Sequence, residues 1–384
     1  MRCWLTVGWL WIGLWIGLAW TRPAAALDHV TVRQQGKQVK VSGRVLVSAQ
    51  DGGVLLAARD GVLWTVQPED LVEHTQDDAP FAPLSAEEMC ERLLGELPRG
   101  FKAHQTTHYL IFHNASREYA AWCGSLFERL HMAFTNFWSR RGFNLSAPEF
   151  PLVAIVFADR RDYESYARQE LGEAVSAIIG YYSLRTNRMT LFDLTGVAEL
   201  GRGSRASTAA QINRILSQPE AERMVATVVH EATHQIAFNC GLHTRYSDCP
   251  LWFSEGIALY FETPDLSSAK GWSTIGAVNR LRLGQFQEYL KRRPADSLLT
   301  LIRDDERFRD TKLGPDAYAE AWALTYSLLR QRPKQYIAYL RVLSAKEPAR
   351  PDDAATRLRE FQQAFGDDLQ KLDAEVARYM FRLR

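Results

Sequence analysis

The hydrophobic pattern of this chain changes along its length, and this change limits the folds open to it. Between residues 27 and 76, apolar and polar residues alternate in short runs, which turn sequences such as Gln35-Gly36 and Asp51-Gly52 separate. Alternation with a period of two is typical of half-buried β-strands. From about residue 209 onward, apolar residues recur instead with helical spacing. Strands and helices segregated in this way predict an α+β fold.

The stretch between these two regions has a mixed character. Continuous apolar runs at 109–112 and 151–157 predict buried strands, and residues 117–140 carry a helical apolar stripe. Residues 178–194 predict a β-hairpin whose turn contains Arg185-Thr186-Asn187. This stretch is therefore expected to be α/β.

These patterns predict the domain organisation. We expect a small β-strand domain over 27–76, a linker over 77–84 and one larger domain over 85–384. Within the larger domain, an α/β part over 85–208 would precede a mostly helical part over 209–384.

The segment 1–26 has the features of a secretory signal peptide. Arg2 precedes an uncharged apolar run from Cys3 to Trp20, and Ala24-Ala25-Ala26 offers the small residues that a signal peptidase requires. We expect cleavage after Ala26 and export to the periplasm or the extracellular space. The alternative is an uncleaved membrane anchor, because an apolar run of this length is just long enough to span a bilayer. Only in that case would we expect contact with a membrane.

The net charge excludes one large class of partners. The full chain has 46 Lys and Arg against 45 Asp and Glu. The predicted signal peptide contains only Arg2 and Arg22 as charged groups, so its removal leaves 44 basic against 45 acidic side chains. A neutral chain without a basic block has no field that attracts nucleic acid, and we expect no nucleic-acid partner.

Export would place the remaining cysteines in an oxidising compartment. Cys90, Cys123, Cys240 and Cys249 are four in number, which allows two disulfides in three possible pairings. We expect Cys90 to pair with Cys123 and Cys240 with Cys249, because the second pair flanks one short loop. The alternative is four buried thiols.

The most specific motif is the sequence HEATH at residues 230–234. Histidines four residues apart lie one turn apart on the same face of a helix, so His230 and His234 can bind one metal ion. Glu231 projects beside that face. It can act as a general base toward water without being a ligand itself.

A second motif, LWFSEGIALYFE at residues 251–262, follows the first after a short connection. A catalytic zinc ion takes three protein ligands and keeps one open position, and two histidines with one glutamate are a standard set. Glu255 would supply the carboxylate near the start of a helix that Pro250 introduces. We expect one Zn²⁺ per chain, bound by His230, His234 and Glu255. The alternative is that Glu255 caps its own helix.

Together these motifs resemble those of the gluzincin zinc metallopeptidases, in which a glutamate helix of the Trp-x-x-Glu-Gly type follows His-Glu-x-x-His. The second motif is similar to that of the zinc aminopeptidase branch, and the overall layout resembles small secreted bacterial peptidase-like proteins of the same clan. The resemblance implies a zincin-like domain with a mixed sheet and an active-site helix. It also implies zinc on His230, His234 and Glu255, with Glu231 as the base.

The resemblance further implies an oxyanion-stabilising tyrosine. In the aminopeptidase branch, a tyrosine that opens a later helix donates its hydroxyl to the tetrahedral intermediate, and Tyr318 matches it. Tyr326, two turns further along the same predicted helix, is the second candidate. The alternative is that Tyr318 and Trp322 form an aromatic pair in the core.

One departure from the family bears on specificity. The aminopeptidases carry an upstream Gly-x-Met-Glu-Asn motif whose glutamate binds the substrate's amino terminus, whereas the segment 181–194 here contains no glutamate. We therefore expect an exported zinc metallopeptidase that acts on a peptide or protein substrate, as an endopeptidase rather than an aminopeptidase. The alternative is a non-catalytic exported scaffold or binding protein in which the metal is structural or absent.

Overall fold

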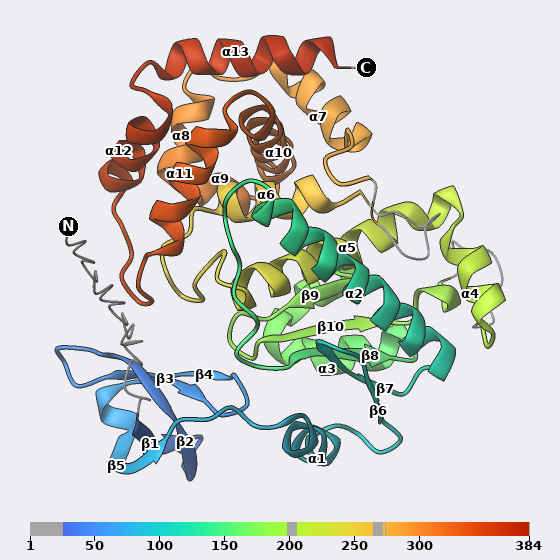
Figure 1. Ribbon diagram of the computed structural model, residues 1–384, viewed down its shortest axis with the longest axis vertical. Helices are drawn as coiled ribbons and strands as arrows, with labels where there is room; N and C mark the ends of the chain where they lie inside the picture. The colour runs from blue at the N-terminus through green and yellow to red at the C-terminus, as the bar shows by residue number, and fades with distance from the viewer. Residues whose placement is uncertain (1–25, 198–205, 264–271, 273, 384) are drawn as a thin grey trace, which may run out of the picture.

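The computed structural model describes residues 26–197, 206–263, 272 and 274–383 (Figure 1). The predicted signal peptide lies, up to residue 25, outside the described residues. An antiparallel sheet comes first, a second sheet with flanking helices follows, and the C-terminal part is helical. The predicted α+β fold is confirmed.

The N-terminal sheet has five strands in the order β4-β3-β2-β1-β5. Its elements are β1 (Ala26–Gln34), β2 (Lys37–Ser48), β3 (Val54–Ala58), β4 (Leu63–Val66), the short 3₁₀ helix η1 (Pro68–Asp70) and β5 (Leu71–Pro80). The first four strands form the expected meander, and β5 returns to pair antiparallel with β1. This pairing joins Leu27 to Asp77 and Ala26 to Pro80. Strand structure therefore covers the first half of the segment in which the sequence predicts a linker.

The second sheet has the strand order β6-β7-β8-β10-β9. Its strands are β6 (Lys102–Gln105), β7 (Tyr109–His113), β8 (Leu152–Phe157), β9 (Gly180–Tyr182) and β10 (Arg188–Phe192). The central strands β7, β8 and β10 are parallel, and β9 is an antiparallel edge strand. The predicted hairpin is present, and its turn ends at Asn187, whose φ of 62° is left-handed.

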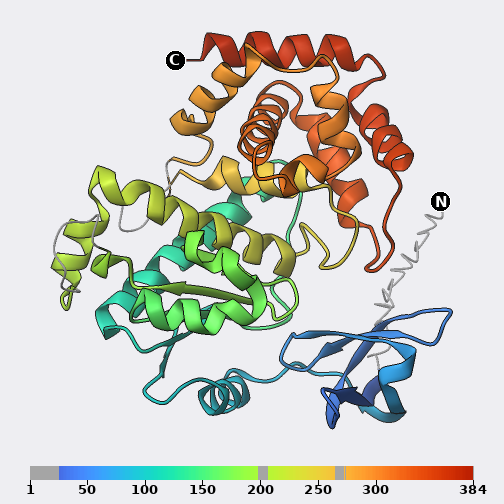
Figure 2. The same ribbon diagram turned by 180° about the vertical axis from the view of Figure 1, so that it is seen from behind.

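Helices cover both faces of this sheet (Figures 1 and 2). On one face lie α2 (Arg117–Ser139) and α5 (Pro219–Asn239); on the other lie α1 (Ala86–Glu96) and α3 (Arg160–Leu171). The connections contain η2 (Gly172–Ala177), η3 (Leu194–Gly196) and α4 (Ala209–Leu216). Strand β8 is buried at every position because helices pack on both faces of the sheet.

The remaining helices form the C-terminal layer, which packs on α5 through α6 (Leu251–Phe261). They are α7 (Arg280–Leu290), α8 (Ser297–Arg303), α9 (Glu306–Arg309), α10 (Gly314–Gln331), α11 (Pro333–Ser344), α12 (Ala354–Phe365) and α13 (Leu369–Arg382). A single apolar core extends from α1 to α13, whereas the N-terminal sheet has two small clusters of its own. Among the described helices, none has the length and apolarity needed to cross a membrane.

Helices α6 and α10 approach each other unusually closely at Gly256. A Cβ atom at this position would lie 2.1 Å from the Thr325 hydroxyl and 2.9 Å from the Ala321 carbonyl oxygen, both on α10. Such distances are far inside van der Waals contact, and a backbone carbonyl cannot rotate away. Only glycine allows this approach, which fixes where α6 lies.

We expect Gly256→Ala to lower the free energy of unfolding by about 1–3 kcal/mol, because the extra methyl group overpacks the α6–α10 contact. Gly284→Ala is the matched control, since Gly284 lies in the exposed middle of α7 and a methyl group placed there would have no atom within 4 Å. Alanine there should stabilise the helix by about 1 kcal/mol. Urea unfolding of both variants measures the difference, and equal effects would contradict close packing at Gly256.

Candidate metal site

The two histidines of the HEATH motif lie on α5, one turn apart, as predicted. The helix begins at Pro219, and Glu220 and Glu222 in its first turn interact favourably with the positive end of the helix dipole. Its C-terminal half is anchored to the second sheet by Gln235, a fully buried side chain. The Gln235 amide donates hydrogen bonds to the carbonyl oxygens of Val153 (2.8 Å) and Asn187 (3.2 Å). This anchor fixes α5 relative to the strands β8 and β10.

Helix α6 brings Glu255 to the same place. Pro250 precedes the helix, as predicted, and the backbone N–H of Leu251 donates to the Asp305 carboxylate at 2.9 Å. The carboxylate of Glu255 does not cap its own helix. Instead it contacts His230 and His234.

The three predicted ligand side chains form one compact cluster. The distance between Nε2 of His230 and Nε2 of His234 is 3.2 Å. Oε2 of Glu255 lies 3.1 Å from the first of these nitrogens and 3.5 Å from the second. Ligand atoms about 2.0 Å from a tetrahedral zinc ion lie about 3.3 Å from one another. The three measured distances bracket that value, so the donor set fits a tetrahedral ion with one position left open.

The electrostatics of the cluster reflect two opposing effects. Burial disfavours a charge on His230, but the hydrogen bond to Glu255 and the negative charges of Glu255, Glu231 and Glu262 together outweigh burial and raise the pKa of His230 to about 9. Burial likewise disfavours the Glu255 carboxylate, yet His234 and His230 hold its pKa well below the ordinary value. The ionised carboxylate is ready to bind a divalent cation, whereas zinc would displace the proton that His230 carries at neutral pH, because a ligating imidazole must be neutral.

Glu231 lies beside this cluster without belonging to it. One of its carboxylate oxygens accepts a hydrogen bond of 2.9 Å from the backbone N–H of Tyr182, which is part of the edge strand β9. Burial raises the pKa of Glu231, and the nearby His230 and His234 offset this only in part. A carboxylate with a raised pKa is a better proton acceptor than an ordinary one.

The structure separates the two candidate tyrosines. Tyr318, in the first half of α10, lines the same cavity as the three ligand side chains and Glu231. The negative charge of Glu255, and then burial, raise the pKa of Tyr318 well above its usual value, so its hydroxyl keeps its proton. Tyr326 is buried among Trp322, Tyr260 and Tyr379 and does not line this cavity. Tyr318 is therefore the better placed of the two.

The cavity has a volume of about 280 Å³. Its lining combines the charged cluster with a largely apolar or aromatic wall that includes Tyr182, Leu184, Phe238, Tyr246 and Leu251. Of the described residues that line the cavity, two carry a carboxylate, Glu231 and Glu255.

The predicted disulfides are absent, and this is a correction. Cys90, Cys123, Cys240 and Cys249 are all free thiols. Cys240 points toward α2, where its Sγ atom lies 3.7 Å from Nε2 of His131. Proximity in the sequence is misleading here, because Cys240 faces α2, whereas the Sγ atom of Cys249 lies 3.7 Å from Nδ1 of His243 and Cys249 lines the cavity.

An ionic contact anchors the loop between α5 and α6 where a disulfide was expected. Both carboxylate oxygens of Asp248 accept hydrogen bonds from Arg357 on α12, at 3.0 and 2.7 Å. Arg357 also lies 3.1 Å from Asp305, the residue that binds the first N–H of α6. The anchor thus links this loop, the start of α6 and the C-terminal layer. No spacing signal in the sequence announces it.

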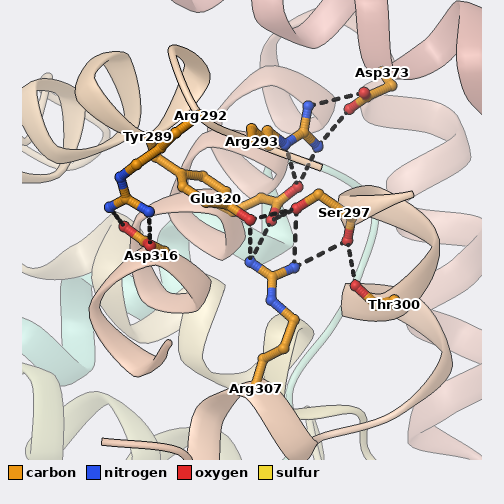
Figure 3. A network of polar contacts seen from close by, with 9 residues as sticks. All are labelled: Tyr289, Arg292, Arg293, Ser297, Thr300, Arg307, Asp316, Glu320 and Asp373. Atoms are coloured by element: carbon orange, nitrogen blue, oxygen red, sulfur yellow. Dashed lines mark hydrogen bonds and ion pairs between the residues drawn. The ribbon is translucent and has the colours of Figure 1, made fainter. Parts of the chain in front are cut away.

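A buried ion network holds the first half of α10, on which Tyr318 lies (Figure 3). Its centre is Glu320, which is 2% exposed. Its carboxylate binds Arg293 and Arg307, the latter at 2.8 Å, and accepts a hydrogen bond of 2.7 Å from Ser297. Arg293 in turn binds Asp373 of α13. The network therefore ties α10 to α8, α9, α13 and the residues that follow α7.

Comparisons with known proteins identify the shared part of the chain. Residues 224–350 match a family model described as a protein of unknown function, DUF1570. A search of curated proteins finds no match. The matched segment covers less than half of the chain, yet it contains the ligand cluster, Glu231 and Tyr318. The segment that matches this family model thus carries the candidate site.

We expect Glu320→Gln to lower the free energy of unfolding by about 3–5 kcal/mol, because it leaves the buried guanidinium groups of Arg293 and Arg307 without full compensation. Glu288→Gln is the matched control, since the Glu288 side chain is 70% exposed and pairs with Lys291 at the surface. That change should cost at most about 1 kcal/mol. Chemical denaturation measures both, and a Glu320→Gln variant as stable as the control would refute a structural role of the network.

Proposed function

We propose that this protein is an exported zinc-dependent peptidase that cleaves internal peptide bonds. The observation that carries the proposal is the set of distances among His230, His234 and Glu255, which matches the edges of a tetrahedral zinc site, with Glu231 beside it. A structural zinc site would be closed by a fourth protein ligand, and the donor group among the described residues has three members. Export rests on the sequence of the segment 1–26.

Zinc bound by these side chains would supply Lewis acidity, which polarises a carbonyl group and lowers the pKa of water. The protein's own groups would do the rest. Glu231, fixed by the Tyr182 backbone N–H, accepts the proton from the attacking water and passes it to the leaving amine. The protonated hydroxyl of Tyr318 donates a hydrogen bond to the negative charge that develops on the carbonyl oxygen.

Two observations favour cleavage within a chain over removal of terminal residues. Among the described residues, the cavity lining contains no carboxylate beyond Glu231 and Glu255, so it lacks the third carboxylate that would pair with a free amino terminus. In addition, β9 is an edge strand next to the cavity, and an edge strand can align an extended peptide through backbone hydrogen bonds. Both features suit a substrate that continues past the cavity in both directions.

The decisive experiment compares zinc content and peptide hydrolysis in the wild type and its variants. We expect the wild type to contain about one zinc ion per chain and to cleave peptides blocked at both ends. Glu255→Gln should lose the metal. Glu231→Gln should keep it while hydrolysis falls by about 10²- to 10⁴-fold, because only the proton acceptor is removed. Elemental analysis and mass spectrometry of a blocked peptide library provide the two measurements.

Glu288→Gln is the matched control, because the Glu288 side chain is 70% exposed and pairs with Lys291 at the surface of α7. It should retain both zinc and activity. A wild type without bound metal would refute the proposal. A wild type that binds zinc but cleaves no peptide would favour a binding protein with a structural metal.

A further inference from the structure

Part of the apolar wall of the cavity is supported by the N-terminal sheet. Tyr246, from the loop between α5 and α6, lines the cavity and also packs against a cluster formed by Leu55, Ala57 and Leu63 of strands β3 and β4. The sheet therefore lies directly behind a residue of the cavity wall, although the two are far apart in the sequence.

The backbone of Tyr246 is held in an unfavourable conformation. Its φ of 63° is left-handed, which costs a side chain of this size free energy that the surroundings must offset. The carbonyl oxygen of Tyr246 accepts a hydrogen bond of 2.8 Å from the N–H of Ala349, and Ser247 forms a β-bridge with Pro348. These contacts fix the backbone on one side, while the sheet supports the ring on the other.

A second part of the wall depends on the same sheet. The guanidinium group of Arg245 donates to the carbonyl oxygens of Gly61 (2.8 Å) and Leu184 (3.1 Å) and so joins the sheet to the β9–β10 turn. The N–H of Leu63 donates to the carbonyl oxygen of Arg185 in that turn, at 2.7 Å. Leu184, which lines the cavity, is thus held in place by β4 and by the turn that precedes β4.

The chemistry of this wall defines what it can accept. Beyond the three ligands, Glu231 and the Tyr318 hydroxyl, the described part of the lining consists of apolar or aromatic residues with two serines and one thiol, and these residues carry no further charge. A charged side chain would lose its hydration there without gaining a partner, whereas an apolar one would gain by burial.

We propose that the N-terminal sheet is the outer layer of a subsite that selects a large apolar side chain next to the cleaved bond, with Tyr246 as the specificity-determining residue. This inference rests on the proposed peptidase function. The inference also makes the sheet part of the mature enzyme. If the sheet were removed on activation, Tyr246 and Leu184 would lose their support.

Two leucines of strand β3 allow a matched test. Leu55 and Leu56 are both buried, but Leu55 belongs to the cluster under Tyr246, whereas Leu56 points to the opposite face of the sheet. Leu55→Ala and Leu56→Ala remove the same atoms from the same strand. Loss of sheet stability alone would affect both variants alike.

The measurement is the ratio of kcat/KM for two blocked peptides that differ only in having Leu or Ala beside the cleaved bond. We expect the wild type and Leu56→Ala to prefer Leu by about tenfold or more. Leu55→Ala should lose most of this preference, as should Tyr246→Ala, because the wall is no longer held. If Leu55→Ala fails to fold, Leu55→Val tests the same contact with a smaller expected loss.

A binding measurement separates this inference from the proposed function. Calorimetry of the same two peptides with Glu231→Gln, alone and combined with Leu55→Ala or Leu56→Ala, reports the preference without hydrolysis. The subsite would be supported if Glu231→Gln preferred the Leu peptide and if adding Leu55→Ala, but not Leu56→Ala, reduced this preference. That result would hold even if the wild type cleaved nothing. Equal preference in the Leu55→Ala and Leu56→Ala backgrounds, or no preference in the Glu231→Gln single variant, would overturn it.

Discussion

The contact of α6 with α10 at Gly256 determines the geometry of the candidate site. Because no Cβ atom intervenes, the two helices lie close enough for α6 to present Glu255 to the histidines of α5 while α10 presents Tyr318 to the same cavity. The other interactions then maintain this arrangement. Gln235 fixes α5 on the sheet, and the network around Glu320 fixes α10.

Much of the site was predictable because its signals are local. The four-residue spacing of His230 and His234 states their common face directly, and the helix that contains Glu255 carries its own start signal in Pro250. The strands and helices around them follow from the apolar periodicity in the same way. The role of Tyr318 is implied by the resemblance alone, and only the packing of α10 shows that Tyr318, rather than Tyr326, lines the cavity.

The features that the sequence did not reveal depend on contacts between distant segments. Backbone groups such as the Tyr182 N–H on Glu231 leave no trace in residue type. The pairing of β5 with β1 extends strand structure to Pro80 despite the Asp and Pro residues that signal a turn there, because ladder hydrogen bonds outweigh the local preference. The absence of a bridge between Cys240 and Cys249 is of the same kind, since tertiary packing decides where each thiol points.

The central claim is that two imidazoles and one carboxylate bind zinc and leave one position open. An X-ray absorption spectrum of the zinc-loaded protein tests this claim most directly, because it reports the atoms bound to the metal. The account predicts nitrogen and oxygen neighbours at about 2.0–2.1 Å and no sulfur. A sulfur neighbour at about 2.3 Å, as ligation by Cys249 in the cavity wall would give, would contradict it.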